Sequence, residues 1–214
     1  MIQINNISFS FGSNKIIQDL SFEIEKGKTY CIMGRSGIGK TTLIKLISGL
    51  IKPDNGKISG TEKLKKSFIF QENRLLPNLS VYENLKYVTA DENKISEALK
   101  NTELLSEKNK MTDELSGGMA RRAAIARAIA FDGDVYFIDE PLYGLDVKTS
   151  QGILELIKNT VKNKTAIIIT HSPEEAFYLS DKIVFLKNIP VSETEIVDTS
   201  VFSSADEIKT HLLA

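Results

Sequence analysis

The chain has 214 residues, of which 42% are hydrophobic and 26% are charged, and its formal net charge is -1. This length suits one domain or one core with a subdomain, and the composition is ordinary for a globular protein. The small net charge excludes a global signal for nucleic-acid binding, and no apolar run approaches the roughly 18 residues that span a bilayer.

The stretch up to about residue 33 is predicted to form strands. Leu20, Phe22 and Ile24 alternate with polar neighbours, as in a half-buried antiparallel strand. The start of the sequence alternates similarly and lacks the basic and apolar regions of a signal peptide. The single cysteine, Cys31, has no partner for an internal disulfide and lies in an apolar run, so we expect a buried thiol. These features predict a chain that is cytosolic or faces the cytosol.

Four continuously apolar runs predict strands that are buried on both faces. Helical patterns separate these runs, which favours an α/β fold with a mainly parallel sheet and helices on both sides. An antiparallel β-subdomain would precede this sheet. The runs are Thr29–Met33, Val135–Ile138, Ala166–Ile169 and Ile183–Leu186.

Residues 72–116 differ from the rest of the chain, because polar and helical patterns dominate there without a buried strand. We expect an inserted helical subdomain in this segment, with 1–71 and 117–214 forming the core and its β-subdomain. After residue 188 the sequence predicts a strand near Glu195–Asp198 and an amphipathic helix over Ala205–Leu213, with His211 on the surface.

A phosphate-binding loop follows the strand Thr29–Met33 and matches the pattern G-x-x-x-x-G-K-[ST] in full. Glycines let such a loop turn its N–H groups inward, and the following helix adds its positive N-terminal end. The lysine would reach the β- and γ-phosphates, and the threonine hydroxyl would ligate Mg²⁺. The predicted nucleotide-binding residues of this loop are Gly34, Arg35, Ser36, Gly37, Ile38, Gly39, Lys40, Thr41 and Thr42.

Two carboxylates end the apolar run Val135–Ile138. Asp139 is predicted to complete the Mg²⁺ shell with Thr41. Glu140 would point to the opposite side, toward the attacking water, where a carboxylate is well placed to act as general base. A P-loop alone indicates only nucleotide binding, because GTPases, small-molecule kinases, helicases and transport ATPases share it.

The segment Leu115–Met119 reads Leu-Ser-Gly-Gly-Met and opens a helix that runs to Phe131. Glycine N–H groups at a helix start form an anion site, which predicts a second phosphate contact at Ser116, Gly117 and Gly118. An ordinary N-cap is the alternative for this segment. We expect Arg121, Arg122 and Arg127 to serve the structure of the helix, with phosphate contact as the alternative.

This segment resembles the signature of the ABC transporter family, usually LSGGQ, and the resemblance covers nearly the whole chain, as a P-loop NTPase core. It implies that Phe11 stacks on adenine, that Gln71 contacts Mg²⁺ and water, and that His171 hydrogen-bonds the γ-phosphate. It also implies a D-loop at Gly144–Asp146, with Asp146 near the nucleotide. Met119 departs from the usual glutamine, and Tyr143 replaces a small residue.

The resemblance further implies an ATPase that works as a head-to-tail dimer, with two ATP molecules between two copies of the chain. Separate transmembrane permease subunits would bind it at the cytoplasmic face of the membrane, and a solute-binding protein would act indirectly. The segments Gln71–Pro77 and Val81–Asn84 resemble importers of the nitrate, sulfonate, taurine and thiamine-precursor group. An apolar set beside Gln71 would form either a groove for the permease or subdomain core: Leu75, Leu76, Pro77 and Tyr82.

Other readings remain open at this point. The chain would alternatively energise an exporter or a cell-division or lipoprotein-release complex. A kinase or repair ATPase is the rival from another class, although a kinase does not need Ser116–Gly118 or Glu140. No nucleic-acid partner is expected, and the transported substrate is not encoded in an ATPase chain that never touches it.

Overall fold

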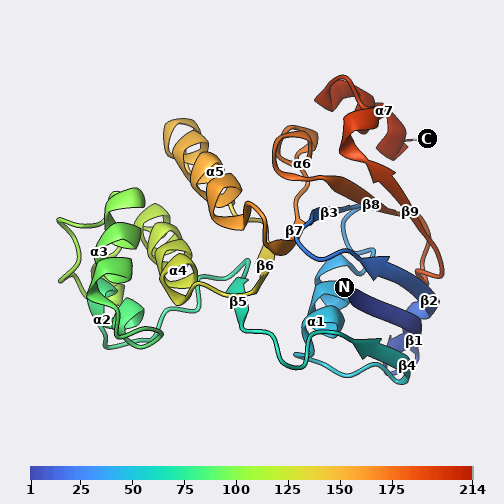
Figure 1. The fold of residues 1–214 in the computed structure, drawn as a ribbon, viewed down its shortest axis with the longest axis horizontal. Helices are drawn as coiled ribbons and strands as arrows, with labels where there is room; N and C mark the ends of the chain where they lie inside the picture. Colours follow the sequence, from blue (N-terminus) through green and yellow to red (C-terminus); the bar gives the residue numbers. More distant parts are fainter. Residues whose placement is uncertain (214) are drawn as a thin grey trace.

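The computed structural model describes residues 1–213, which contain a six-stranded and a three-stranded sheet (Figure 1). The larger sheet has the order β5-β6-β7-β3-β8-β9 and is parallel except for β9, which pairs antiparallel with β8. The α/β fold predicted from the apolar runs is therefore confirmed. The strands of this sheet are β3 (Thr29–Met33), β5 (Lys66–Ile69), β6 (Val135–Asp139), β7 (Thr165–Ile169), β8 (Lys182–Leu186) and β9 (Thr194–Asp198).

The smaller sheet is antiparallel, with the order β2-β1-β4, and confirms the β-subdomain near the N-terminus. Its strands are β1 (Ile2–Phe11), β2 (Asn14–Ile24) and β4 (Asn55–Ser59). The sequence does not predict β4, because its residues are mostly polar and exposed and show no apolar alternation. Pairing with β1, rather than local propensity, holds this edge strand in place.

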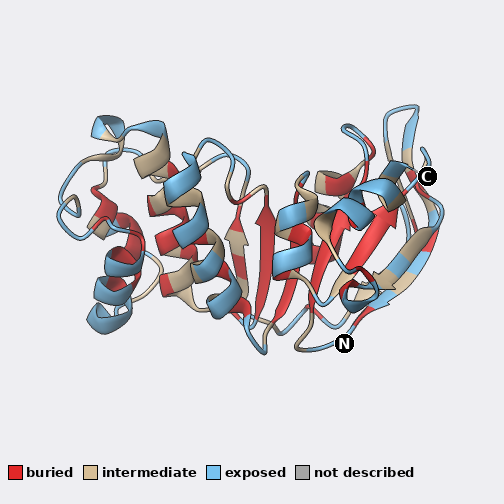
Figure 2. Cartoon of the chain, turned by 90° about the horizontal axis from the view of Figure 1, so that it is seen from above, coloured by how far each residue is buried: buried red, intermediate tan, exposed pale blue. Residues whose placement is uncertain are grey.

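Helices cover both faces of the larger sheet, and β3 shows how its side chains divide between them. Tyr30 and Ile32 pack with α1 and the smaller sheet, whereas Cys31 and Met33 pack with α5 and α6. Burial raises the pKa of the Cys31 thiol to about 12, which fits the predicted buried thiol. Figure 2 shows the strands as the buried interior. The covering helices are α1 (Lys40–Ser48), α5 (Val147–Val161), α6 (Pro173–Leu179) and α7 (Ala205–Leu213).

A separate helical group lies at one end of the molecule (Figure 1). Leu85, Leu99 and Ala126 belong to a third apolar cluster within this group. The predicted division at residues 72 and 116 stays a prediction, but α4 begins beyond it and packs with α2 and α3. The group comprises α2 (Val81–Lys86), α3 (Glu92–Asn101) and α4 (Gly117–Phe131); short 3-10 helices lie at η1 (Thr112–Glu114) and η2 (Thr199–Val201).

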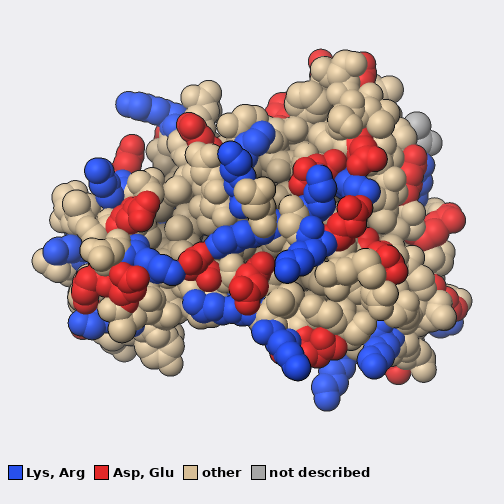
Figure 3. Space-filling model, in the orientation of Figure 1, with Lys and Arg blue, Asp and Glu red and all other residues tan. Residues whose placement is uncertain are grey.

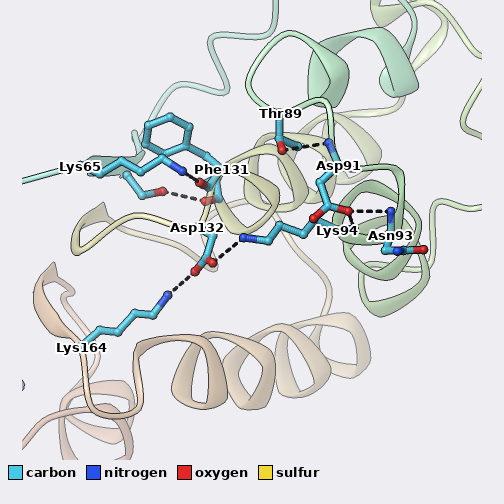
Figure 4. Close-up of polar contacts among 10 residues, drawn as sticks. Lys65, Thr89, Asp91, Asn93, Lys94, Phe131, Asp132 and Lys164 are labelled. Atoms are coloured by element: carbon cyan, nitrogen blue, oxygen red, sulfur yellow. Dashed lines mark hydrogen bonds and ion pairs between the residues drawn. The ribbon is translucent and has the colours of Figure 1, made fainter.

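One carboxylate connects the helical group to the sheet (Figure 4). Asp132 follows α4 in the left-handed conformation, with φ of 54°, and accepts a hydrogen bond of 2.7 Å from Lys94 of α3. It also pairs with Lys164, which lies just before β7. Hydrogen bonds from Lys164 and then Lys94 lower the pKa of Asp132 to about 2. Asp132 thus links α3 and the start of β7 to the C-terminal end of α4.

The C-terminal region departs from the prediction at His211. Its ring packs against Phe185 and Phe202, with centroid distances of 4.6 and 5.6 Å, and its Nε2 lies 3.0 Å from Glu195 Oε1. The prediction of a plain surface histidine was therefore wrong, because the amphipathic pattern of α7 does not show that this face meets β8 and β9.

The surface carries mixed charge. On the face in Figure 3, positive and negative side chains are interspersed rather than gathered into a field of one sign. Within residues 1–213 no helix has both the length and the apolar character needed to cross a bilayer.

Candidate functional site

The loop between β3 and α1 has two positions that accommodate only glycine. Gly34 and Gly39 have φ of 155° and 111°. A Cβ at Gly34 would lie 2.8 Å from the carbonyl oxygen of Leu186, and one at Gly39 would lie 2.7 Å from Ile16 Cγ2. The two positions therefore need glycine both for conformation and for space, which lets the loop turn tightly into α1.

The N-terminus of α1 is a ready anion site. Gly39 caps the helix without a side-chain hydrogen bond, and no acidic residue lies in the first turn. The first N–H groups of α1 are thus left for a ligand. Lys40 is buried, and its Nζ donates to the carbonyl oxygens of Gly34 at 2.8 Å and Arg35 at 3.1 Å. Burial lowers the pKa of Lys40. Arg35, Ser36, Gly37, Ile38 and Thr42 complete the loop and the first helical turn.

The hydroxyl of Thr41 meets the carboxylate at the end of β6. Thr41 Oγ1 donates to Asp139 Oδ2 at 2.9 Å. Asp139 is 6% exposed, and burial raises its pKa while the bond from Thr41 opposes that shift. A hydroxyl and a buried carboxylate are hard oxygen donors of the kind that Mg²⁺ takes in proteins. The donor set therefore fits this metal, together with phosphate oxygens.

Glu140 and His171 face one another at the carboxyl ends of β6 and β7. Glu140 Oε1 lies 2.7 Å from His171 Nε2. The backbone of Glu140 is left-handed, with φ of 48°, and its N–H donates to Ile169 at 2.9 Å. A non-glycine residue in this conformation stores strain of roughly 1–3 kcal/mol, which persists only where the surroundings hold it. The structure thus brings together two of the predicted catalytic residues.

A third carboxylate, not predicted, lies close to this pair. Thr170 Oγ1 donates to Glu175 Oε2 at 2.6 Å and accepts from the N–H of Ser172 at 3.0 Å. Burial raises the pKa of Glu175. Together these bonds brace the turn that carries His171. An open cavity of about 890 Å³ lies over these residues and the D-loop. In the sequence, Glu175 could have been noticed only as an acidic residue in the first turn of the helix that follows His171.

The second predicted phosphate site lies on a different part of the fold. Ser116 caps α4 by accepting from the N–H of Met119 at 3.3 Å, with no acidic residue in the first turn. Gly117 and Gly118 begin the helix. Figure 1 places α4 in the helical group and α1 beside the smaller sheet, with β5 and β6 between them. Asp146 likewise caps α5 by accepting from the N–H of Thr149 at 3.0 Å.

Two further predicted residues are accessible. Phe11 is 59% exposed, and its ring meets Phe9 edge-on at 4.9 Å. Gln71 is exposed just beyond β5. The sequence predicted that Arg121 serves the structure of α4, but not which groups it binds: Arg121 is 2% exposed and donates to backbone carbonyls at the ends of β5 and β6. Only the tertiary fold brings those carbonyls to α4.

A family model for "ABC transporter" matches residues 17–143, which include the P-loop, the signature segment and the carboxylates of Asp139 and Glu140. The chain belongs to the ABC transporter family. It is therefore an ATPase domain of the ABC type, and the resemblance stated from the signature segment is confirmed.

Curated relatives of this ABC domain include subunits of more than one kind of system. An aliphatic sulfonates import ATP-binding protein of Bacillus cereus is 35% identical over 94% of this chain and 86% of its own length. An intermembrane phospholipid transport ATP-binding protein of Haemophilus influenzae is 36% identical over 85% of this chain and 78% of its own. Two further relatives are longer, and this chain spans 58% and 59% of their lengths.

Solved structures carry the same fold. The ATP-binding cassette MJ0796, described as a dimer in a post-hydrolysis state bound to ADP and Pi, superimposes with a TM-score of 0.82. Its sequence is 28% identical to this one, and the match covers 93% of this chain and 99% of that one. The layout of sheet and helical group in this ABC domain is thus that of a cassette which has been seen with hydrolysis products.

Proposed function

We propose that the chain is the ATP-hydrolysing, energy-coupling subunit of a multi-subunit importer. The observation that carries this proposal is the Glu140–His171 pair at 2.7 Å, which lies next to the Thr41–Asp139 pair at 2.9 Å. A nucleotide-binding site needs only the second pair. A carboxylate held beside it by a histidine is what hydrolysis requires in addition.

Each side chain has a distinct task in this proposal. Lys40 and the N–H groups of α1 bind the β- and γ-phosphates, and the ring of Phe11 stacks on the adenine. Glu140 accepts a proton from the attacking water. His171 orients Glu140 and hydrogen-bonds the γ-phosphate, and Gln71 reaches the water and the metal site from the other side.

Thr41 and Asp139 are proposed to hold Mg²⁺, with Gln71 as a further ligand. Bound there with ATP, Mg²⁺ supplies charge neutralisation at the β- and γ-phosphates. Asp139 is suited to this task because burial in an otherwise apolar strand end makes its carboxylate a costly charge unless a cation compensates it.

We further propose that two copies of the chain form a head-to-tail dimer around two ATP molecules. The support is that one chain carries two helix N-termini free of acidic residues, at α1 and α4, on separate parts of the fold. Because the two N-termini belong to separate parts of the fold, we expect Ser116, Gly117 and Gly118 of a second copy to meet the γ-phosphate. Asp146 would lie at the same interface.

The remaining partners follow from the same proposal. Transmembrane permease subunits would dock on the chain at the cytoplasmic face of the membrane, and a solute-binding protein would act through them. The sulfonate importer relative supports import. The phospholipid-transport relative supports a second candidate, an ATPase of a lipid-transport, export or release complex. Co-purification of the chain with a solute-binding protein separates the two.

The test of hydrolysis and dimerisation is Glu140→Gln. We expect the purified wild-type chain to release phosphate from Mg-ATP, and the variant to release at least about a hundredfold less. The variant should elute from size-exclusion chromatography as a dimer with Mg-ATP and as a monomer without it. Glu155→Gln, on the exposed face of α5, is the matched control and should behave as wild type.

Two outcomes would contradict the proposal. Undiminished phosphate release by Glu140→Gln would remove Glu140 from the role of base. A variant that binds ATP but stays monomeric at high protein concentration, while the wild type hydrolyses normally, would exclude the composite site.

A further inference from the structure

Arg121 is the largest fully buried side chain of the described residues, and every donor that it has is used. A guanidinium offers five N–H groups and no acceptor. Nε donates once, and Nη1 and Nη2 donate twice each. The five acceptors are the carbonyl oxygens of Phe70, Gln71 (3.2 Å), Asp139 (3.1 Å), Glu140 and Pro141 (2.9 Å).

These acceptors come from two chain segments that lie beside one another because β5 and β6 are paired. Phe70 and Gln71 lie just beyond β5, and Asp139 is the last residue of β6, directly before Glu140 and Pro141. Arg121 itself is on the second turn of α4, the helix that Ser116 caps. One side chain thus ties the start of the signature helix to the backbone on both sides of the proposed water site.

The contact with Glu140 has a further meaning because that residue is strained. Its φ of 48° is left-handed, and its carbonyl oxygen accepts from both Arg121 and the N–H of Tyr143. Strained backbone persists only where its surroundings over-determine it. Arg121 is the buried group that reaches this carbonyl from another element, so the left-handed turn at Glu140 depends on the position of α4.

The hydrogen-bond partners of the Arg121 guanidinium are backbone carbonyl oxygens and not a carboxylate. Burial lowers the pKa of Arg121 to about 10, and the nearby charges of Asp139 and Glu140 oppose that shift. The side chain is therefore a cation at neutral pH, although its hydrogen-bond partners are carbonyl oxygens. Burying such a cation is costly in free energy. Any carbonyl oxygen that moved away would leave one of its buried N–H groups without a partner, which adds to that cost.

We propose that Arg121 is a positioning residue for hydrolysis: from its place on α4, it holds the backbone of Glu140 in the left-handed conformation that places the Glu140 side chain for catalysis. Its hydrogen bonds go to backbone carbonyl oxygens, including those of Gln71, Asp139 and Glu140, rather than to the P-loop or to the side chains of these residues. Loss of its hydrogen bonds therefore slows the chemical step and leaves ATP binding intact. This inference rests on the proposed role of Glu140.

The test compares Arg121→Gln and Arg121→Lys with wild type in the full chain. Glutamine offers two N–H donors and lysine three, so neither can satisfy five carbonyls. Single-turnover phosphate release by Arg121→Gln should fall about a hundredfold, as expected for a catalytic group misplaced by about 1 Å. Binding of a fluorescent ATP analogue should stay within about threefold of wild type. The rate of phosphate release by Arg121→Lys should lie between those of wild type and Arg121→Gln.

Arg122→Gln is the matched control. Arg122 is the neighbouring arginine on α4, and its Nη1 also donates to two carbonyl oxygens, of Thr102 at 2.8 Å and Glu103 at 3.0 Å. These carbonyls follow α3, whereas those that Arg121 binds lie at the ends of β5 and β6. Its replacement should lower thermal stability but leave phosphate release within about threefold of wild type below the melting temperature.

A double variant tests whether Arg121 acts through Glu140. If it does, adding Arg121→Gln to Glu140→Gln should cause no further loss of the residual hydrolysis. A further hundredfold loss would overturn the proposal. So would an Arg121→Gln variant that hydrolyses as the Arg122→Gln control does, or one that loses ATP affinity in parallel with rate.

The failures of the two proposals are distinguishable. A wild-type chain that releases no phosphate contradicts the proposed function, whereas an active wild type with an equally active Arg121→Gln contradicts only the positioning role. Loss of the folded state in both Arg121 variants would assign the side chain to stability alone and would also overturn the inference.

Discussion

Replacing Asp132 by asparagine removes the one negative charge that Lys94 and Lys164 share (Figure 4). The two lysines lower the pKa of this carboxyl from 3.8 to about 2. At about 1.36 kcal/mol per pKa unit, the full shift corresponds to about 2.4 kcal/mol of folding stability. The side chain is 41% exposed, so solvent screening reduces the expected loss to about 1 kcal/mol.

Urea unfolding at pH 7 measures this loss. With a denaturant dependence of about 2.5 kcal/mol per molar, the midpoint of Asp132→Asn should lie about 0.4 M below that of wild type. The matched control is Glu107→Gln, whose carboxylate forms an ion pair with Lys110, three residues away in the same segment, at 2.8 Å. It should shift the midpoint by less, because that ion pair joins no separate elements.

The pH dependence has a definite sign. A carboxyl whose folded pKa is depressed stabilises the protein above its unfolded pKa, and this contribution is lost as the pH falls through the folded value. The gap between wild type and Asp132→Asn should therefore narrow from about pH 4 toward pH 2. A gap that is absent at pH 7, or that widens on acidification, would refute the reasoning.

Two further predictions concern nucleotide contacts. Phe11→Ala should weaken ATP binding about two- to tenfold in a fluorescence titration, while Phe11→Tyr keeps wild-type affinity, because stacking needs the ring alone; equal affinity of all three proteins would remove Phe11 from the site. Ser116→Ala removes the hydrogen bond from the N–H of Met119 to the cap, which should lower the free energy of unfolding by about 1 kcal/mol. ATP binding to the monomer should remain, and the rate of hydrolysis should fall at protein concentrations that permit dimers. A variant that is destabilised but hydrolyses ATP at the wild-type rate would leave Ser116 as a helix cap only.

The elements nearest the nucleotide could be predicted from the sequence because local signals specify them. The apolar run Thr29–Met33 and the glycines that follow it define strand, loop and helix without long-range information. The pair formed by Glu140 and His171 was partly predictable: each residue follows a buried strand, but only the order β6-β7 makes those strands neighbours.

Other features depend on contacts that no local pattern records. The edge strand β4 forms because β1 offers it a partner, and His211 is packed because α7 meets β8. Arg121 looks like any basic residue of an alanine-rich helix in the sequence. Its role appears only when β5 and β6 bring their terminal carbonyls to the same side of α4.

The ammonium group of Lys40 lies on the loop that would receive the nucleotide, bonded to the carbonyl oxygens of Gly34 and Arg35. These two bonds use two of the three N–H groups of the ammonium, so the loop holds the lysine in place and leaves one N–H for a ligand. An anion that reaches the loop meets a lysine whose position is already fixed, beside the free N–H groups at the start of α1. The entropy of ordering this long side chain is thus lost when the chain folds, and not when a ligand binds.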